Sequence, residues 1–372
     1  MNKLDPMNKL YLSLLALFSG AILPLAFAPF GYYLVAEVSL VLLLVTWFRA
    51  KPGTSFWYGW LFGAAFFGCG VYWVYISIHH YGQAPIILSV FILALLVAFM
   101  ALYPALLGYI LNRFFPKNNL YKFLLVFPAG FVILEWIRGW FFSGFPWLFL
   151  GYGHIDAPLR GFASIFGVYG VSFVITATAG AIFSIFYWRK NKKLLFALIM
   201  FIVFLWGAGF GLTKISWTKQ VDKKVQVSLI QGNVSQEEKW ESKKLWPILN
   251  AYNLLTLKSF GSKIIVWPEA AIPTYPEDVG LYLKALSFAA EKSGSTILSG
   301  APFYDEKAKA YYNGILTLGA DRGRYYKRQL VPFGEYMPLK SLLSWLRNYL
   351  LLLLLLGVVC RHFLILSLLP FL

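Results

Sequence analysis

Long apolar segments separated by short polar ones dominate the first 213 residues of the chain. Seven can be distinguished, at residues 10–28, 33–48, 56–78, 85–111, 123–141, 161–188 and 194–213. A helix needs about 20 apolar residues to cross a bilayer, and most of these segments reach that length. The whole chain is 59% hydrophobic, whereas soluble domains are about 45–50% apolar. The sequence therefore predicts a multi-pass α-helical membrane domain over residues 1–213, with seven transmembrane helices.

The basic residues between these segments indicate a topology. Every second connection is rich in lysine and arginine, as at Arg49 and Lys51 or at 189–193, and the alternating connections carry few. Because positively charged loops stay in the cytoplasm, we expect a cytoplasmic N-terminus. Residues from 214 onward then lie on the outer side of the membrane, which for a bacterial chain is the periplasm. This topology also accounts for the net charge of +17, so we predict no nucleic-acid partner.

A different periodicity follows the seventh apolar segment. Residues 225–231, 263–267, 295–301, 312–319 and 324–327 have the pattern of strands, and 245–260 and 279–292 have helical spacing. Strands that alternate with helices indicate an α/β layer structure, here over residues 214–345. Residues 346–372 form an apolar tail whose middle contains Arg361 and His362, where charge is costly in a bilayer.

Glu135 and Arg138 form a charged pair within the predicted span 123–141. They are three residues apart, so they lie on one helical face. One interpretation is a self-neutralising pair near the membrane surface. The other is a wall for a lipid headgroup, because ionisable residues inside membranes are costly and usually functional.

Two charged residues follow predicted strands in the α/β region. Glu269 follows an apolar strand and Pro268, and Lys327 ends the segment 324–327. If the two strand ends meet, a carboxylate that accepts a proton and an ammonium that stabilises an oxyanion face one pocket. A structural salt bridge explains the same residues, because most ion pairs have no catalytic role.

Several short motifs occur in an order that resembles one known family. They are the segments 27–29, 70–75, 135–148, 231–233, 239–240, 267–269 and 326–338. The α/β region resembles the carbon–nitrogen hydrolase (nitrilase) superfamily, which has a Glu-Lys-Cys triad on an αββα sandwich. From about residue 10 to 345, the chain resembles the apolipoprotein N-acyltransferases of bacterial inner membranes.

The resemblance implies an enzyme that takes an acyl chain from a phospholipid and holds it as a cysteine thioester. The acceptor is the α-amine of the diacylglyceryl-cysteine at an apolipoprotein N-terminus. By this resemblance Glu269 is the general base, Lys327 stabilises the oxyanion and Glu335 supports Lys327. Trp240 lies on a mobile arm that gates lipid access; a membrane-anchoring tryptophan is the alternative. No cofactor is implied, because thiol-mediated acyl transfer needs none.

The chain departs from the family pattern after about Trp345. The family's nucleophile lies well beyond the lysine in an Ile-Cys-Tyr-Glu-like strand, and Cys360 is too close to Lys327 and has a different context. Cys69 and Cys360 also lack partners at metal-site spacing, so no metal is predicted. We therefore identify no nucleophile, and a frameshift or truncation explains the apolar tail.

An incomplete α/β sandwich has consequences for folding and activity. The missing strands leave sheet edges and apolar faces uncovered. We expect the chain to fold poorly outside the membrane and to be inactive. The competing hypothesis is a catalytically dead membrane protein that binds lipid or serves as a scaffold.

Overall fold

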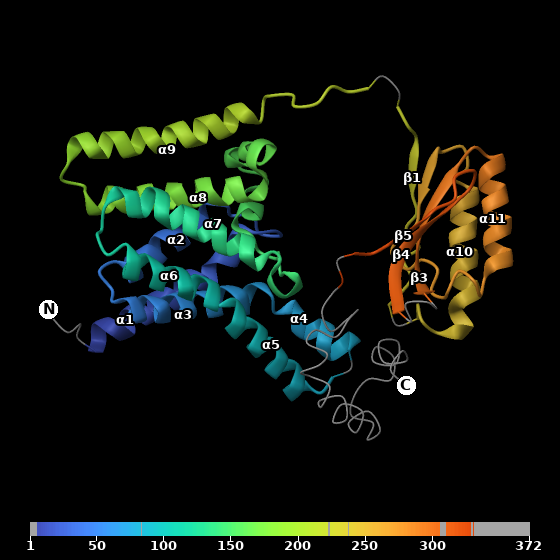
Figure 1. Cartoon of the computed structure of the whole chain (residues 1–372), viewed down its shortest axis with the longest axis horizontal. Coiled ribbons are helices and arrows are strands. Elements are labelled where there is room, and N and C mark those ends of the chain that lie inside the picture. Colours follow the sequence, from blue (N-terminus) through green and yellow to red (C-terminus); the bar gives the residue numbers. More distant parts are fainter. Residues whose placement is uncertain are drawn as a thin grey trace. The chain divides into compact units, whose positions relative to one another are not determined.

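A computed structural model describes residues 6–82, 84–221, 224–236, 238–305, 310–328 and 330. The chain divides into two compact units, Met1–Thr218 and Lys219–Leu372, which we call the helical unit and the sheet unit (Figure 1). Apolar helices thus precede a mixed α/β fold, in the order that the sequence predicts.

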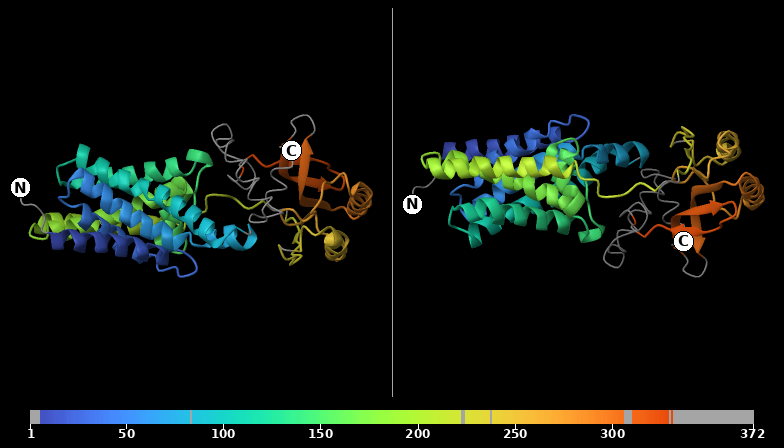
Figure 2. Two further views of the ribbon diagram at one scale, coloured as in Figure 1. Left: turned by 90° about the horizontal axis from the view of Figure 1, so that it is seen from below. Right: turned by 90° about the horizontal axis from the view of Figure 1, so that it is seen from above.

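The helical unit is built from α-helices joined by short 3₁₀ and π segments, and Figure 2 shows it from two further sides. The α-helices are α1 (Pro6–Ile22), α2 (Leu34–Trp47), α3 (Pro52–Gly70), α4 (Trp73–Ile76), α5 (Ile86–Met100), α6 (Leu102–Phe114), α7 (Phe127–Arg138), α8 (Ala163–Tyr187) and α9 (Lys192–Leu212). The short segments are η1 (Leu23–Ala26), η2 (Ser77–Tyr81), η3 (Lys122–Val126), η4 (Phe141–Ser143), η5 (Leu150–His154) and η6 (Pro158–Phe162).

Several of these helices have the length and composition of membrane spans. Among the described residues, four qualify alone, namely Asn8–Ala26, Ile86–Phe114, Pro158–Tyr187 and Lys192–Leu212. A fifth is counted if Pro52–Gly70 and Trp73–Tyr81, bent by 52°, form one span.

Two of the predicted apolar segments form shorter helices. The segment 33–48 gives the 14-residue α2, which at 1.5 Å per residue spans only about 21 Å. The segment 123–141 gives η3 and α7, which end at the buried charged residue Arg138. The seven crossings inferred from the charge pattern stay a prediction.

The charged pair of α7 is an internal anchor. Glu135 and Arg138 are both buried, with 3.9 Å between Arg138 Nη2 and Glu135 Oε1. The Arg138 guanidinium donates hydrogen bonds to the carbonyls of Phe145 and Trp147, and the Leu150 N–H donates to Glu135 Oε1 at 2.6 Å. The structure thus pairs the two charged groups with each other and with backbone groups of the following loop.

Within the described residues, the sheet unit has one five-stranded sheet in the order β1-β2-β3-β4-β5. Its elements are β1 (Val227–Leu229), η7 (Ser242–Lys244), α10 (Leu245–Leu257), β2 (Ile264–Val266), α11 (Gly280–Lys292), β3 (Thr296–Asp305), β4 (Ala310–Leu318) and β5 (Arg324–Tyr326). Strands β1 to β3 run parallel, and β4 and β5 continue the sheet antiparallel. Each strand and helix expected in this region is present.

The hydrophobic core lies on one face of this sheet. Alternate strand residues point to opposite faces, and Ile265, Ile297 and Leu316 belong to the set that packs against the helices. Leu249 of α10 and Leu286 of α11 complete the same core. Both helices lie on one side of the sheet (Figures 1 and 2).

The second face of the sheet, opposite α10 and α11, carries apolar side chains that remain exposed. Leu229 is 78% exposed, Ile315 43% and Tyr325 52%. Ile315 pairs with Tyr325 and is next to the core residue Leu316, which places both on this face. Leu229 pairs with Val266, which is next to the core residue Ile265, so Leu229 lies on the same face. These exposures are those of the described residues, and the expectation that missing strands leave the face uncovered stays a prediction.

We expect Arg138→Met to reduce the free energy of unfolding of the helical unit by about 3–5 kcal/mol, because it leaves the Glu135 carboxylate buried and unpaired. Arg160→Met is the matched control. Arg160 is also 3.9 Å from a carboxylate, that of Asp156, but both side chains are exposed, so the expected loss is below about 1 kcal/mol. Unfolding in mixed detergent micelles measures both, and equal losses would contradict the anchoring role.

Candidate functional site

The site begins where β2 ends. Trp267 follows the strand and is buried, its Nε1–H donates to Thr256 Oγ1 at 2.9 Å, and its ring stacks on Tyr252. The Trp267 N–H also donates to the Leu298 carbonyl of β3, so pairing with β3 continues one residue beyond β2. The loop that contains Pro268 and Glu269 therefore begins at an anchored residue.

Gly300 of β3 lets the Glu269 loop lie against the sheet. A β-carbon at position 300 would be 2.6 Å from the Ala270 nitrogen and 2.8 Å from the Glu269 α-carbon, both backbone atoms. The Gly300 N–H donates to the Pro268 carbonyl at 3.3 Å, and the Ile272 N–H donates to the Gly300 carbonyl at 3.2 Å. Glycine is the residue that permits this approach.

Strand alternation places Glu269 and Lys327 on the same side of the sheet. Ala301 is in the core, so the adjacent Gly300, and the loop that contacts it, lie on the second face. Tyr326 packs edge-to-face on the core residue Phe303 at 5.3 Å, so the next residue, Lys327, emerges on the second face as well.

The two charged groups meet there. Lys327 Nζ is 3.7 Å from Glu269 Oε1, although β2 and β5 are separated in the sheet by β3 and β4. The Glu269 side chain is 72% exposed and that of Lys327 33%. An ion pair this exposed contributes at most about 1 kcal/mol to stability, so folding alone gives little reason for it.

Lys239 is a third charged group at this site, and sequence reasoning did not predict its contact with the Glu269 loop. Its Nζ donates to the Glu269 backbone carbonyl at 3.0 Å, across 30 residues of sequence. Partial burial lowers the pKa of the Lys239 ammonium, and the Glu269 carboxylate opposes that shift. The neighbouring Trp240 is half-buried. The hydrogen bond of Lys239 connects the segment that carries Trp240 to the Glu269 loop.

Glu335, which was predicted to support Lys327, and Cys360, which was rejected as the nucleophile, lie outside the described residues. Within the described part of the chain the one cysteine is Cys69, an exposed residue of α3 in the helical unit. The described residues therefore bring together a carboxylate and two ammonium groups, and they place no thiol in the sheet unit.

Comparison with known proteins decides the family. Residues 19–181 match the apolipoprotein N-acyltransferase N-terminal domain, and residues 226–346 match the carbon–nitrogen hydrolase family. The apolipoprotein N-acyltransferase of Coxiella burnetii is 43% identical over 339 residues, which cover 91% of this chain and 70% of the relative.

The chain belongs to the apolipoprotein N-acyltransferase family. Relatives of the same name in Methylococcus capsulatus and Vibrio parahaemolyticus are 42% and 38% identical, over 91% and 90% of this chain and 67% of each relative. The family is one of membrane enzymes. In this chain the region that matches the carbon–nitrogen hydrolase family includes Lys239, Glu269 and Lys327.

We expect Gly300→Ala to reduce the free energy of unfolding of the sheet unit by about 1–3 kcal/mol, because the new methyl group must displace the backbone of the Glu269 loop. Gly280→Ala is the control, since a β-carbon there has no neighbour within 4 Å. Chemical unfolding of the two variants should separate them, and a Gly300→Ala protein as stable as Gly280→Ala would disprove the close approach.

The lowered pKa of Lys239 predicts a pH dependence of stability. The unfolded chain, with a lysine pKa near 10.4, binds this proton more tightly than the folded protein, so raising the pH towards that value disfavours unfolding. The wild type should therefore gain stability relative to Lys239→Met and Lys239→Arg as the pH rises towards about 10.4. A stability difference that stays constant or moves the other way as the pH rises would be inconsistent with burial of the ammonium.

Proposed function

We propose that the chain retains the carboxylate and the ammonium of its family's reaction, which serves lipoprotein maturation. In that reaction an acyl chain moves from a phospholipid, through a cysteine thioester, to the α-amine of diacylglyceryl-cysteine in an apolipoprotein. The observation that carries this proposal is the 3.7 Å approach of Lys327 Nζ to Glu269 Oε1 on the second face of the sheet. Family membership supports it independently.

In the first half-reaction, Glu269 accepts the thiol proton while sulfur attacks the ester carbonyl of the phospholipid. The Lys327 ammonium donates a hydrogen bond to the oxyanion that forms. The ester C–O bond then breaks, and Glu269 returns the proton to the departing lysophospholipid oxygen. The 3.7 Å separation allows one carbonyl group to contact both side chains.

In the second half-reaction, nitrogen of the acceptor amine attacks the thioester carbonyl and gives its proton to Glu269. Lys327 again stabilises the oxyanion, and the C–S bond breaks as Glu269 returns the proton to the departing sulfur. In this scheme Glu335 supports Lys327, and Trp240 gates lipid access from the arm that Lys239 ties to the Glu269 loop.

The nucleophile is the part of the scheme that this chain does not match. Its cysteines, Cys69 and Cys360, both stand in sequence contexts unlike that of the family's nucleophile. We therefore propose that the chain positions the acyl group but does not accumulate a thioester. A lipid-binding protein without turnover is the second candidate function, and the sequence context of Cys360, which differs from that of the family's nucleophile, favours it.

The topology is part of the same proposal. Residues 1–213 form the membrane domain, 214–345 the carbon–nitrogen hydrolase-like domain and 346–372 an apolar tail that lies outside the described residues. The alternating basic loops support an inner-membrane protein whose residues from 214 onward are periplasmic. A domain on that side has access to phospholipid and to lipoprotein N-termini.

An added thiol tests the proposal. The full chain in detergent is incubated with a phospholipid that carries an isotope-labelled acyl chain, with and without a small soluble thiol. Without the thiol, we expect no hydroxylamine-sensitive acyl adduct on the protein by intact mass. With it, we expect acyl transfer to the added thiol, because Glu269 and Lys327 can act on an external nucleophile.

The variants identify the groups responsible. Glu269→Gln and Lys327→Met should each slow transfer to the added thiol by about 10²-fold or more. Glu291→Gln, which removes another exposed carboxylate of the sheet unit, should not. Equal rates in all four proteins would reject the two catalytic roles, and an acyl adduct on Cys360 would reject the claim that the nucleophile is missing.

A further inference from the structure

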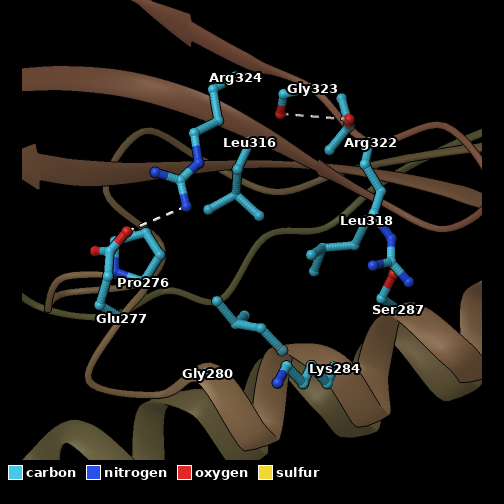
Figure 3. Close-up of a pocket in the computed structure, with 12 residues that line it drawn as sticks. Pro276, Glu277, Gly280, Lys284, Ser287, Leu316, Leu318, Arg322, Gly323 and Arg324 are labelled. Carbon is cyan, nitrogen blue, oxygen red and sulfur yellow. Dashed lines mark hydrogen bonds and ion pairs between the residues drawn. The ribbon is translucent and has the colours of Figure 1, made fainter.

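A cavity of about 460 Å³ lies in the sheet unit between α11 and the β4–β5 hairpin (Figure 3). Lys284 of α11 reaches it from the helix, and Arg322 and Arg324 reach it from the hairpin. Glu277, which precedes α11, supplies its one carboxylate, so the lining carries three cationic side chains and one anionic. Neither Glu269 nor Lys327 lines this cavity.

The hairpin is fastened to the helix, which fixes the cationic side chains around the cavity. Gly319, with φ +124°, turns the chain after β4, and its N–H donates to Oγ of the buried Ser287 at 2.9 Å. The Thr317 N–H donates to the Gly323 carbonyl at 3.0 Å and closes the turn. Ser287 is three residues from Lys284, so the anchor and the lysine share one face of α11.

The charges of the cavity are unbalanced. Arg324 Nη2 pairs with Glu277 Oε1 at 3.1 Å. In the described part of the chain, Lys284 and Arg322 have no carboxylate within ion-pair distance. Like charges held around one cavity repel each other, and an anion between them removes that cost.

The chemistry of the lining selects the anion. Guanidinium groups bind phosphate oxygens through paired hydrogen bonds, and an ammonium adds a point charge. Leu283, Leu316 and Leu318 form an apolar part of the lining. The cavity therefore suits a phosphate that carries an organic group, which rests against the leucines.

We propose that Lys284, Arg322 and Arg324 form a binding site for a phosphate ester, distinct from the Glu269–Lys327 pair. The ester is the headgroup of an anionic lipid or a soluble phosphate ester. Glu277 competes with it for Arg324, so the ion pair opens when the phosphate binds. Removal of this carboxylate then strengthens binding, an effect that a merely structural ion pair does not produce.

Binding of glycerol 1-phosphate to the full chain in neutral detergent tests the site by calorimetry. Arg322→Ala and Lys284→Ala should each weaken binding about tenfold, the loss expected for one charge-assisted contact. Glu277→Gln should strengthen it severalfold. Lys258→Ala, which removes an exposed lysine of another helix, is the charge-matched control and should bind as the wild type does.

A second probe identifies the source of the phosphate. The second probe is dihexanoyl phosphatidylglycerol. If it binds much more tightly than glycerol 1-phosphate and its binding depends on Arg322 in the same way, the site binds a lipid headgroup. Equal affinities assign it to a soluble ester. Glu269→Gln should bind both probes normally, which separates this site from the proposed acyl transfer.

Three results would overturn the proposal. They are no saturable binding of either probe to the wild type, equal binding by Arg322→Ala and Lys258→Ala, and weaker binding by Glu277→Gln. Thermal unfolding of each variant checks the fold, and because Lys284, Arg322 and Arg324 are exposed we expect their substitution to leave it intact.

Discussion

The one-sided burial of the sheet governs the architecture of the sheet unit. Apolar residues at alternate positions, such as Ile265, Ile297 and Leu316, bury themselves against α10 and α11. Their neighbours in sequence must then point to the second face. Glu269 and Lys327 come together on that face because the core occupies the other one, and Gly300 removes the side chain that would hold the Glu269 loop away.

In the helical unit the constraint concerns charged side chains that are buried among apolar ones. A buried charge is costly, so each such side chain needs a partner of opposite charge or hydrogen bonds. Arg138 lies near Glu135 and binds loop carbonyls, and His154 Nε2 is 3.0 Å from Glu37 Oε1 with both side chains buried. These pairs join separate parts of the chain, α7 to the loop that follows it and α2 to η5. Polar residues in the helices thus hold irregular backbone in place.

Charge is used differently in the sheet unit. The Glu269 carboxylate lies 3.7 Å from Lys327, and its backbone carbonyl accepts a hydrogen bond from Lys239, so two ammonium groups converge on one exposed loop. In the cavity beside α11, Glu277 balances one of three cationic side chains. Exposed charges of this kind add little to stability. Both sites therefore suit binding and chemistry better than they suit folding.

The amino-acid sequence by itself determined the order of helices and strands and the family. Apolar length, charge alternation and strand periodicity are local properties, so they predicted the helices of the first unit, the strands and helices of the second, and Glu269 and Lys327 at strand ends. The apolar segment 33–48 corresponds to α2, Leu34–Trp47, so apolar length also located this short helix to within one residue at each end. Only the tertiary structure decided which distant groups meet. The contact of Lys239 with the Glu269 carbonyl, the approach over Gly300 and the assembly of Lys284, Arg322 and Arg324 depend on strand register and helix packing, which join residues far apart in sequence and leave no periodic signal.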